Sequence, residues 1–507
     1  MKLKATLTAE QREIVLSQAR CIHVHAFAGT GKTTVLTEYA DARPDKRILY
    51  LAYNRTTAQE ARAKFGRHVT CMTTHALAWH SHGKKFEHKL GNLRERHVMT
   101  ALAVDPKLAH FVVKTVEAFL HSARDGLLEE HVPSFVPTSA KTEVLSRANR
   151  IWSWMCDVGR KDIPMPHDGY LKLYALSKPS LSSRYDIILF DEAQDANPVT
   201  ADLIRRQRDR CTIVLVGDPH QAIYRFRGAV DALANADGAT ILPLTCSFRF
   251  GEEIALLNTV FLKLFKGETR QLLGLRKDAG DFLDVRREFP MTHLGRTNAT
   301  VFRRAFRGLG RHRLHFVGGI ESYAFDKLLD VHRLALRIKP IDPFYRSFDS
   351  VGELRAYAKT VMDKENIGLI RLTSAYGDEI PHLVDRVKAE AVCDQRDATL
   401  ILSTTHKSKG LEFRQVKVAD DDFEKLVTDD HGLRVMDTPE LVEEANLHYV
   451  AMTRATHALI PSQEFGLALE PMVKEWRRQE LPSHRQLPRA HDARRQVAAA
   501  SRGRKNS

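Results

Sequence analysis

Short apolar runs recur along the chain, and each is followed by a polar or glycine-containing turn. They are rich in Ile, Val and Leu and show little alternation with polar positions, which is typical of strands buried on both faces of a sheet. Helical patterns such as Thr56–Phe65 separate several of them. Strands that alternate with helices predict a parallel α/β sheet. The predicted strands are Cys21–Ala26, Ile48–Ala52, Asp186–Phe190, Thr212–Val216 and Thr399–Leu402.

Two long segments interrupt this rhythm. Residues 76–184 have a mainly helical pattern, whereas residues 341–395 have a mixed pattern with weak strand signals. We interpret both as insertions into α/β cores. The tail, residues 473–507, is basic, contains two prolines and lacks a sustained apolar period, so we predict that it is disordered.

Length and charge narrow the class of protein. A chain of 507 residues exceeds the usual size of one hydrophobic core, so two or more domains are expected. The net charge of +14 favours a polyanionic partner such as nucleic acid. The N-terminus lacks the apolar core of a signal peptide, and no apolar run is long enough to span a bilayer. We therefore expect a cytoplasmic protein, associated with the nucleoid if the cell is bacterial, with no membrane partner.

The six cysteines form no CxxC pair, and none lies near a histidine at zinc-ligand spacing. We expect free thiols in a reducing compartment rather than a disulfide framework or a zinc cluster.

The first predicted strand leads directly into a glycine-rich loop, and a helical pattern follows it. Such a loop can surround a phosphate with backbone N–H groups at a helix N-terminus. Lys32 is expected to reach the β- and γ-phosphates of ATP, and the hydroxyl of Thr33 to bind Mg²⁺. The strict pattern has Gly where this chain has Ala26. The predicted phosphate-binding residues are Ala28, Gly29, Thr30, Gly31, Lys32, Thr33 and Thr34.

An acidic pair, Asp191 and Glu192, ends the third predicted strand. We predict that Asp191 holds Mg²⁺ through water and that Glu192 orients and deprotonates the attacking water. Together with the phosphate loop, this pair supplies the two parts that phosphoryl transfer needs.

Two aromatic residues, Tyr224 and Phe226, alternate with Arg225 and Arg227 after another predicted strand. Aromatic rings can stack on bases while arginines meet phosphates, which holds a single strand without reading its sequence. This stretch therefore predicts contact with nucleic acid.

In this order the motifs resemble superfamily 1 helicases of the UvrD/Rep type, and within them the helicase part of the F-box DNA helicase family. The likeness covers residues 6 to about 460. It implies an α/β fold with two RecA-like parallel-sheet domains of the P-loop NTPase kind and mostly helical insertions. The implied divisions are a first domain at 1–75 and 185–245 with its insertion at 76–184, a second domain at 246–340 and 396–472 with its insertion at 341–395, and the tail.

The resemblance also assigns roles at the nucleotide. Gln11 reads the adenine edge and Phe248 stacks on the base. Gln221 senses the γ-phosphate, Arg249 meets it, and Arg454 is an arginine finger from the second domain. The further residues expected to approach the nucleotide are Gly410 and Glu412.

Single-stranded DNA and tailed duplexes are the partners that the resemblance implies, with recombination or repair proteins as further candidates. No F-box precedes Gln11, so no partner in a ubiquitin ligase is expected. The family often has Phe at the position of Thr74. The residues expected to contact DNA are Tyr53, Asn54, Thr74, His75, Tyr224, Phe226, Arg227, Arg296, Thr404 and His406.

These observations predict an ATP-dependent helicase or single-stranded DNA translocase, with 3′-to-5′ travel implied by the resemblance alone. A translocase that strips proteins from DNA with little unwinding fits the same motifs, and so does an RNA-directed motor. The resemblance of the GDPHQAIYRFRGA stretch to UvrD-type sequences argues against an RNA-directed motor and against 5′-to-3′ travel. A binding protein with an inactive ATPase remnant is disfavoured because every catalytic position is intact.

Overall fold

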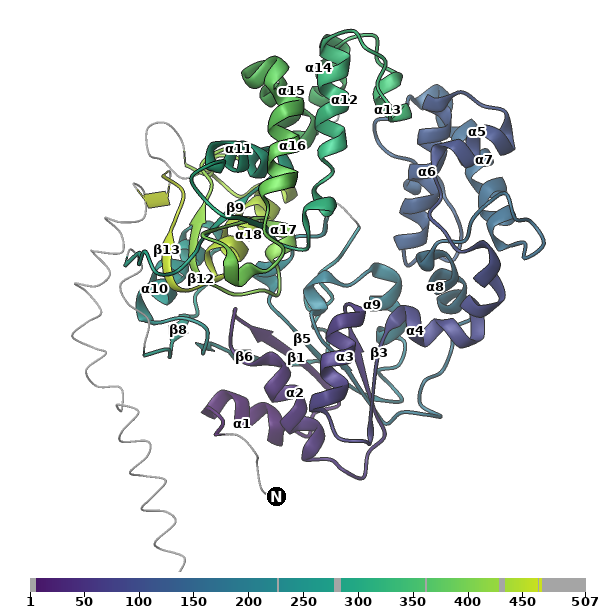
Figure 1. Ribbon diagram of the computed structural model, residues 1–507. Coiled ribbons are helices and arrows are strands. Elements are labelled where there is room, and N and C mark those ends of the chain that lie inside the picture. The colour runs from purple at the N-terminus through teal and green to yellow at the C-terminus, as the bar shows by residue number, and fades with distance from the viewer. Residues whose placement is uncertain are drawn as a thin grey trace, which may run out of the picture.

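The computed structural model describes residues 6–225, 228–277, 284–360, 363–427, 434–463 and 465–466, and these residues contain two large parallel β-sheets (Figure 1). The first sheet has six strands in the order β3-β2-β4-β5-β1-β6, and the second has five in the order β10-β11-β9-β12-β13. The predicted fold class, two RecA-like sheets of the P-loop type, is confirmed. The strands of the first sheet are β1 (Cys21–Ala26), β2 (Ile48–Ala52), β3 (Val69–Thr73), β4 (Ile187–Phe190), β5 (Thr212–Gly217) and β6 (Thr240–Leu244).

The inner strands of the first sheet are buried on both faces, which explains why they are apolar almost throughout. Along β2, Ile48 and Tyr50 belong to one hydrophobic cluster, whereas Leu49 and Leu51 belong to the cluster on the other face. Alternate side chains of a strand point to opposite faces, so both sets must be apolar. The helices closest in sequence to these strands are α1 (Ala9–Leu16), α2 (Lys32–Asp41), α3 (Arg55–Lys64) and α9 (Pro198–Arg205).

The first insertion, between β3 and β4, is helical as the sequence pattern predicted. Its longer helices bury apolar residues at spacings of three and four, as α6 does with Val112, Val116 and Phe119. Asp105 caps the N-terminus of α6, because its side chain accepts hydrogen bonds from the backbone N–H groups of two residues in the first turn. The helices are α4 (Thr74–Ala78), α5 (Glu95–Leu102), α6 (Pro106–His121), α7 (Thr138–Cys156) and α8 (His167–Leu176).

The second insertion, between β10 and β11, corrects the sequence-based expectation. The weak strand signals in 341–395 were wrong, because each regular element described in that range is a helix. Buried residues recur there at helical spacing, as Ile380, Val384 and Val387 do on α16. β-branched residues on the buried face of a helix thus imitated a strand pattern. The helices are α12 (Phe325–Ala335), α13 (Pro343–Arg346), α14 (Val351–Thr360), α15 (Lys364–Tyr376) and α16 (Ile380–Glu390), and they rise above the second sheet in Figure 1.

The second sheet packs against helices α10 and α18, and its core joins residues of both to β9, β12 and β13. No described helix is both long enough and apolar enough to cross a membrane. The tail at 473–507, predicted to be disordered, lies outside the described residues. The elements of this half are β9 (Met291–Gly295), β10 (Leu314–Phe316), β11 (Leu400–Thr404), β12 (Phe413–Val418), β13 (Ala455–Ile460), a two-stranded pair β7 (Cys246–Ser247) and β8 (Leu273–Gly274), and helices α10 (Glu252–Lys266), α11 (Asn298–Gly308), α17 (Thr405–Ser408) and α18 (Pro439–Met452).

Candidate functional site

The loop between β1 and α2 has the geometry of an anion-binding site. Helix α2 begins at Lys32 after Gly31, which has a φ of 78° and provides no side-chain cap. The first backbone N–H groups of the helix therefore remain open to an anion. Gly29 has a φ of 75°, and a Cβ atom there would lie 2.6 Å from Cβ of Arg249 and 2.6 Å from Oγ of Ser247. Backbone conformation and close packing both require glycine at this position.

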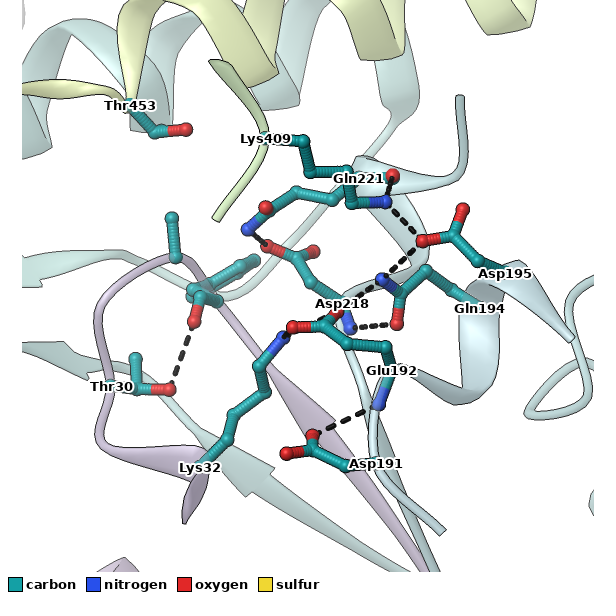
Figure 2. A network of polar contacts seen from close by, with 12 residues as sticks. Thr30, Lys32, Asp191, Glu192, Gln194, Asp195, Asp218, Gln221, Lys409 and Thr453 are labelled. Atoms are coloured by element: carbon teal, nitrogen blue, oxygen red, sulfur yellow. Dashed lines mark hydrogen bonds and ion pairs between the residues drawn. The ribbon is translucent and has the colours of Figure 1, made fainter. Parts of the chain in front are cut away.

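Lys32 is paired with Glu192, one of the two acids that follow β4. Its Nζ lies 3.0 Å from both carboxylate oxygens of Glu192 (Figure 2). Burial alone lowers the pKa of Lys32, but the carboxylates of Glu192 and Asp191 outweigh it and the net shift is upward. Glu192 has a φ of 54°, a strained conformation for a residue other than glycine. The lysine is therefore held charged within reach of the open helix end.

Asp191 is buried beside this pair and is fixed by two donors. The backbone N–H of Glu192 donates to Oδ1 at 2.9 Å, and the hydroxyl of Tyr50 donates to Oδ2 at 2.8 Å. Carboxylate and hydroxyl oxygens are the ligands that Mg²⁺ prefers, so Asp191 and Thr33 suit the metal of an ATP complex. Tyr50 was not predicted, because its position in an apolar strand indicates only core packing.

A buried polar network extends from Glu192 toward the second sheet (Figure 2). Nε2 of Gln194 donates to Glu192 at 2.6 Å and to Asp195 at 3.1 Å, while its Oε1 accepts from the backbone N–H of Asp218 at 3.0 Å. Lys409, which follows α17, pairs with Asp195 and also donates to the carbonyl of Gln221 at 2.5 Å. Gln194, Asp195 and Lys409 lie within the motifs described above, but the sequence patterns assigned no role to them.

Gln221 and two arginines complete the side of the site nearer to the second sheet. Nη2 of Arg454 donates to Oε1 of Gln221 at 3.0 Å, and Nε2 of Gln221 donates to Asp218 at 2.7 Å. Burial, with the charge of Arg249 next, lowers the pKa of Arg454 to about 9. Arg249 donates to Glu412 at 2.8 Å and to the carbonyl of Thr453 at 2.9 Å. Positive charge thus gathers opposite the loop at the start of α2.

Gln11 and Phe248 flank the same loop. A Cβ atom on Gly31 would lie 3.0 Å from Nε2 of Gln11 and 3.8 Å from the ring of Phe248. Gln11 already accepts from the backbone N–H of Thr8 and donates to the carbonyl of Thr30, each at 3.0 Å. An amide nitrogen has two N–H groups, so one donor of Gln11 remains for a base. The ring of Phe248 is 47% exposed and can stack.

A cavity of about 390 Å³ brings most of the predicted nucleotide residues together. Gln11, Asp191 and Phe248 lie outside its lining, as does Ala28, whose N–H donates to the hydroxyl of Tyr449 at 3.2 Å. The predicted residues that line it are Gly29, Thr30, Gly31, Lys32, Thr33, Thr34, Glu192, Gln221, Arg249, Gly410, Glu412 and Arg454.

A second cavity, of about 320 Å³, lies between the first sheet and its insertion. Tyr53, Thr74, His75 and Tyr224, all predicted to contact DNA, line it. The rings of Tyr53 and Tyr224 stack with their centroids 5.7 Å apart. Both tyrosines and Asp195 line the nucleotide cavity as well, so the two cavities are neighbours with shared walls.

Several residues that were predicted to contact DNA also make hydrogen bonds within the protein. Oδ1 of Asn54 caps α3, and Oγ1 of Thr404 caps α17. Nε2 of His75 lies 3.0 Å from Oδ1 of Asp168 on α8, and Nε of Arg296 donates to the buried Glu444 at 3.2 Å. The carbonyl of His406 accepts from the hydroxyl of Tyr224 at 3.3 Å. Phe226 and Arg227 lie outside the described residues.

Comparison with known proteins agrees with this geometry. An AAA domain model matches residues 11–227, and a UvrD-like helicase C-terminal domain model matches residues 337–464. The chain belongs to the UvrD-like superfamily 1 helicases. It is 35% identical to F-box DNA helicase 1 of Gallus gallus over 90% of this chain and 49% of that protein. It is 31% identical to F-box DNA helicase protein 1 of Schizosaccharomyces pombe over 90% of this chain and 57% of that protein.

A more distant relative of this UvrD-like chain is Gabija protein GajB of Bacillus cereus, 24% identical over 56% of this chain and 54% of that protein. The chain spans about half the length of the curated relatives it matches. The family relation therefore concerns the two-sheet unit with its insertions.

Proposed function

We propose that this UvrD-like chain hydrolyses ATP to move along single-stranded DNA in the 3′-to-5′ direction and to separate strands. One observation carries the proposal: Tyr53, Asp195 and Tyr224 belong to the walls of both cavities. A change at the nucleotide can therefore reach the proposed DNA site through direct contact. Two relatives that are named as DNA helicases support DNA as the substrate, and the direction rests on the family resemblance.

Entry of ATP would begin with an exchange of partners at Lys32. Its Nζ, now on Glu192, would turn to the β- and γ-phosphate oxygens, with the open N–H groups of α2 around them. The released carboxylate of Glu192 stays oriented by Gln194 and can accept a proton from the attacking water. Mg²⁺ would be held by Thr33 and, through water, by Asp191, and it neutralises charge between the phosphates.

Closure of the second sheet onto this site would bring Arg249 and Arg454 to the γ-phosphate. Arg454 already meets Gln221, and two residues separate Gln221 from Tyr224 in the same loop. A γ-phosphate that draws Arg454 away from Gln221 would thus move the loop that carries Tyr224. Bases stacked on Tyr224 and Tyr53 would be gripped and released in step with hydrolysis.

The test is ATPase activity with single-stranded DNA or RNA, together with unwinding of 3′- and 5′-tailed duplexes. We expect Lys32→Ala to lower hydrolysis at least ~100-fold while DNA binding persists, because phosphate contacts and not base contacts are lost. Lys46→Ala is the matched control: this lysine of the same domain has a side chain 50% exposed and should be neutral.

Each alternative predicts a different outcome of these assays. Undiminished turnover in Lys32→Ala would reject the ATP site. Equal stimulation by RNA would favour an RNA-directed motor. Stimulation by DNA without strand separation on either tail would favour a translocase that displaces proteins.

A further inference from the structure

A hydrogen bond between two side chains joins the second half of the molecule to the loop that carries Gln221, outside the nucleotide cavity. Nε2 of His220 lies 2.9 Å from Oε2 of Glu268, and the two side chains are only 10% and 9% exposed. His220 immediately precedes Gln221, whereas Glu268 follows α10, which packs in the core of the second sheet. The contact therefore spans the two halves that ATP is proposed to bring together.

Glu268 is held in place independently of His220. Arg270 donates to both carboxylate oxygens, at 3.0 Å to Oε1 and 2.6 Å to Oε2. Nη1 of Arg270 also donates to the carbonyl of His25 on β1 at 3.3 Å. Burial raises the pKa of Glu268, but the hydrogen bonds from His220 and Arg270 outweigh it, so the acid stays ionised. An ionised carboxylate only accepts, so Nε2 of His220 must be the donor.

The imidazole of His220 depends on this single polar contact for its orientation. Its ring stacks on Phe27 with centroids 6.0 Å apart and meets Tyr449 edge-on at 6.0 Å. Within the part of the chain that the structure describes, Nδ1 is buried with no hydrogen-bond partner. Aromatic packing therefore confines the ring, and Glu268 alone fixes its rotation through a hydrogen bond.

The loop from Asp218 to Tyr224 is held by the second half at several points. Arg454 and Lys409 bind Gln221, Asn446 donates to the carbonyl of Ala222 at 2.8 Å, and the hydroxyl of Tyr224 donates to the carbonyl of His406. Arg454 and Lys409 also line the nucleotide cavity, so a phosphate competes for them. The pair of His220 with Glu268 is outside that cavity and can persist when nucleotide enters.

We propose that Glu268 is a positioning residue that couples the proposed DNA site to ATP hydrolysis through His220. By holding the imidazole, it keeps the loop attached to the second half of the molecule, so that closure moves Gln221 and Tyr224 together. The inference rests on the proposed function and deepens it: Glu268 touches neither nucleotide nor DNA.

The test measures the ratio of DNA-stimulated to basal ATPase, which does not depend on the fraction of active protein. Glu268→Gln keeps the shape and removes the charge; His220→Phe keeps the aromatic packing and removes the donor. We expect each to lower the ratio about tenfold, because Gln removes the charge of the acceptor and Phe removes the donor of this hydrogen bond. The KM for ATP should change less than about twofold, because both variants keep an aromatic ring stacked on Phe27 of the phosphate loop. The double variant should fall no further than either single variant, since both break one contact.

Asp330→Asn is the matched control for lost stability. Its side chain is 3% exposed, pairs with Arg333 and accepts from the backbone of Ile341 and Asp342, away from both cavities. It should lower the melting temperature and leave the ratio unchanged. Wild-type ratios in both single variants, or a multiplicative fall in the double variant, would overturn this inference alone. A wild-type chain that DNA does not stimulate would overturn the proposed function, and the inference with it.

Discussion

The two sheets each send their first strand into a helix, but the two helix N-termini are built differently. Helix α2, after β1, is preceded by Gly31, which provides no side-chain cap. Helix α11, after β9, is preceded by Thr297, whose side chain caps the helix by accepting from the N–H of Thr300 at 3.2 Å. The first terminus is open to a ligand, whereas the second is satisfied by the chain itself.

Two carboxylates also accept hydrogen bonds at the N-terminus of α11. Oε2 of Glu365 accepts from the N–H of Asn298 at 3.0 Å, and Oδ2 of Asp422 accepts from the hydroxyls of Thr297 and Thr300 at 2.8 Å and 2.6 Å. Negative charge is favourable at a helix N-terminus, where a phosphate would otherwise bind. The difference teaches that similar parallel sheets need not form two nucleotide sites. The second sheet supplies residues to the first site instead, among them Arg454.

The largest expected effect on ATP hydrolysis comes from removing Arg454, which the second sheet supplies. Arg454→Ala should lower the rate of ATP hydrolysis about a thousandfold, because an arginine finger acts on charge in the transition state. Nucleotide affinity should change less than about threefold, since the phosphate loop belongs to the first sheet. Single-turnover hydrolysis and binding of a fluorescent ATP analogue measure the two effects.

Arg414→Ala, an exposed position on β12 of the same sheet, is the matched control and should alter neither quantity. A parallel loss of affinity and rate in Arg454→Ala would mean that the second sheet holds the ground-state nucleotide. The contrast between the two sheets would then break down.

The next effect concerns the open terminus itself. Gly29→Ala places a Cβ atom 2.6 Å from Arg249 and Ser247 at a φ of 75°. Strain and overlap of this kind should weaken ATP binding roughly 100-fold. Titration with the fluorescent analogue measures it, and affinity equal to that of the wild type would refute the required loop geometry.

Gly310→Ala separates backbone strain from overlap. This glycine has a φ of 70°, but the nearest atom to an added Cβ is Nη2 of Arg386 at 4.0 Å. It should cost about 1 kcal/mol of stability and leave ATP affinity unchanged.

Sequence patterns predicted the buried strands best. The bounds of Cys21–Ala26 and Ile48–Ala52 were correct, because strands covered on both faces must be apolar throughout. In the first sheet the edge strands β3 and β6 were missed, since positions such as Thr70 and Thr240 face solvent and dilute the pattern. In the second sheet only β11 was predicted, and β9, β10, β12 and β13 were missed. Pairing with a neighbouring strand, which a local window does not contain, decides such segments.

Some residues of the candidate site could be predicted from the sequence, and others could not. Lys32 and Glu192 could be predicted because their motifs are contiguous and follow predicted strands. Tyr50 could not, because it lies in an ordinary apolar strand and meets Asp191 only through folding across 141 residues. Glu268 also could not be predicted, because it belongs to no motif and its proposed role depends on its contact with His220 in the folded protein. The roles of the predicted DNA residues stay predictions, with Asn54 and Thr404 also serving as helix caps.

The smallest expected effect concerns the closed terminus. Asp422→Asn removes the charge that receives both threonine hydroxyls, and asparagine tolerates the φ of 70° at this position. It should lower the free energy of unfolding by about 1–2 kcal/mol and the melting temperature by about 2–6 °C. ATP affinity should be unchanged, because α11 is not the nucleotide site. The exposed Asp378→Asn is the control for loss of an acid and should be neutral. If Asp422→Asn instead stabilised the protein, the carboxylate would destabilise the N-terminus of α11. The negative charge of Asp422 would then not explain why this terminus does not bind a phosphate.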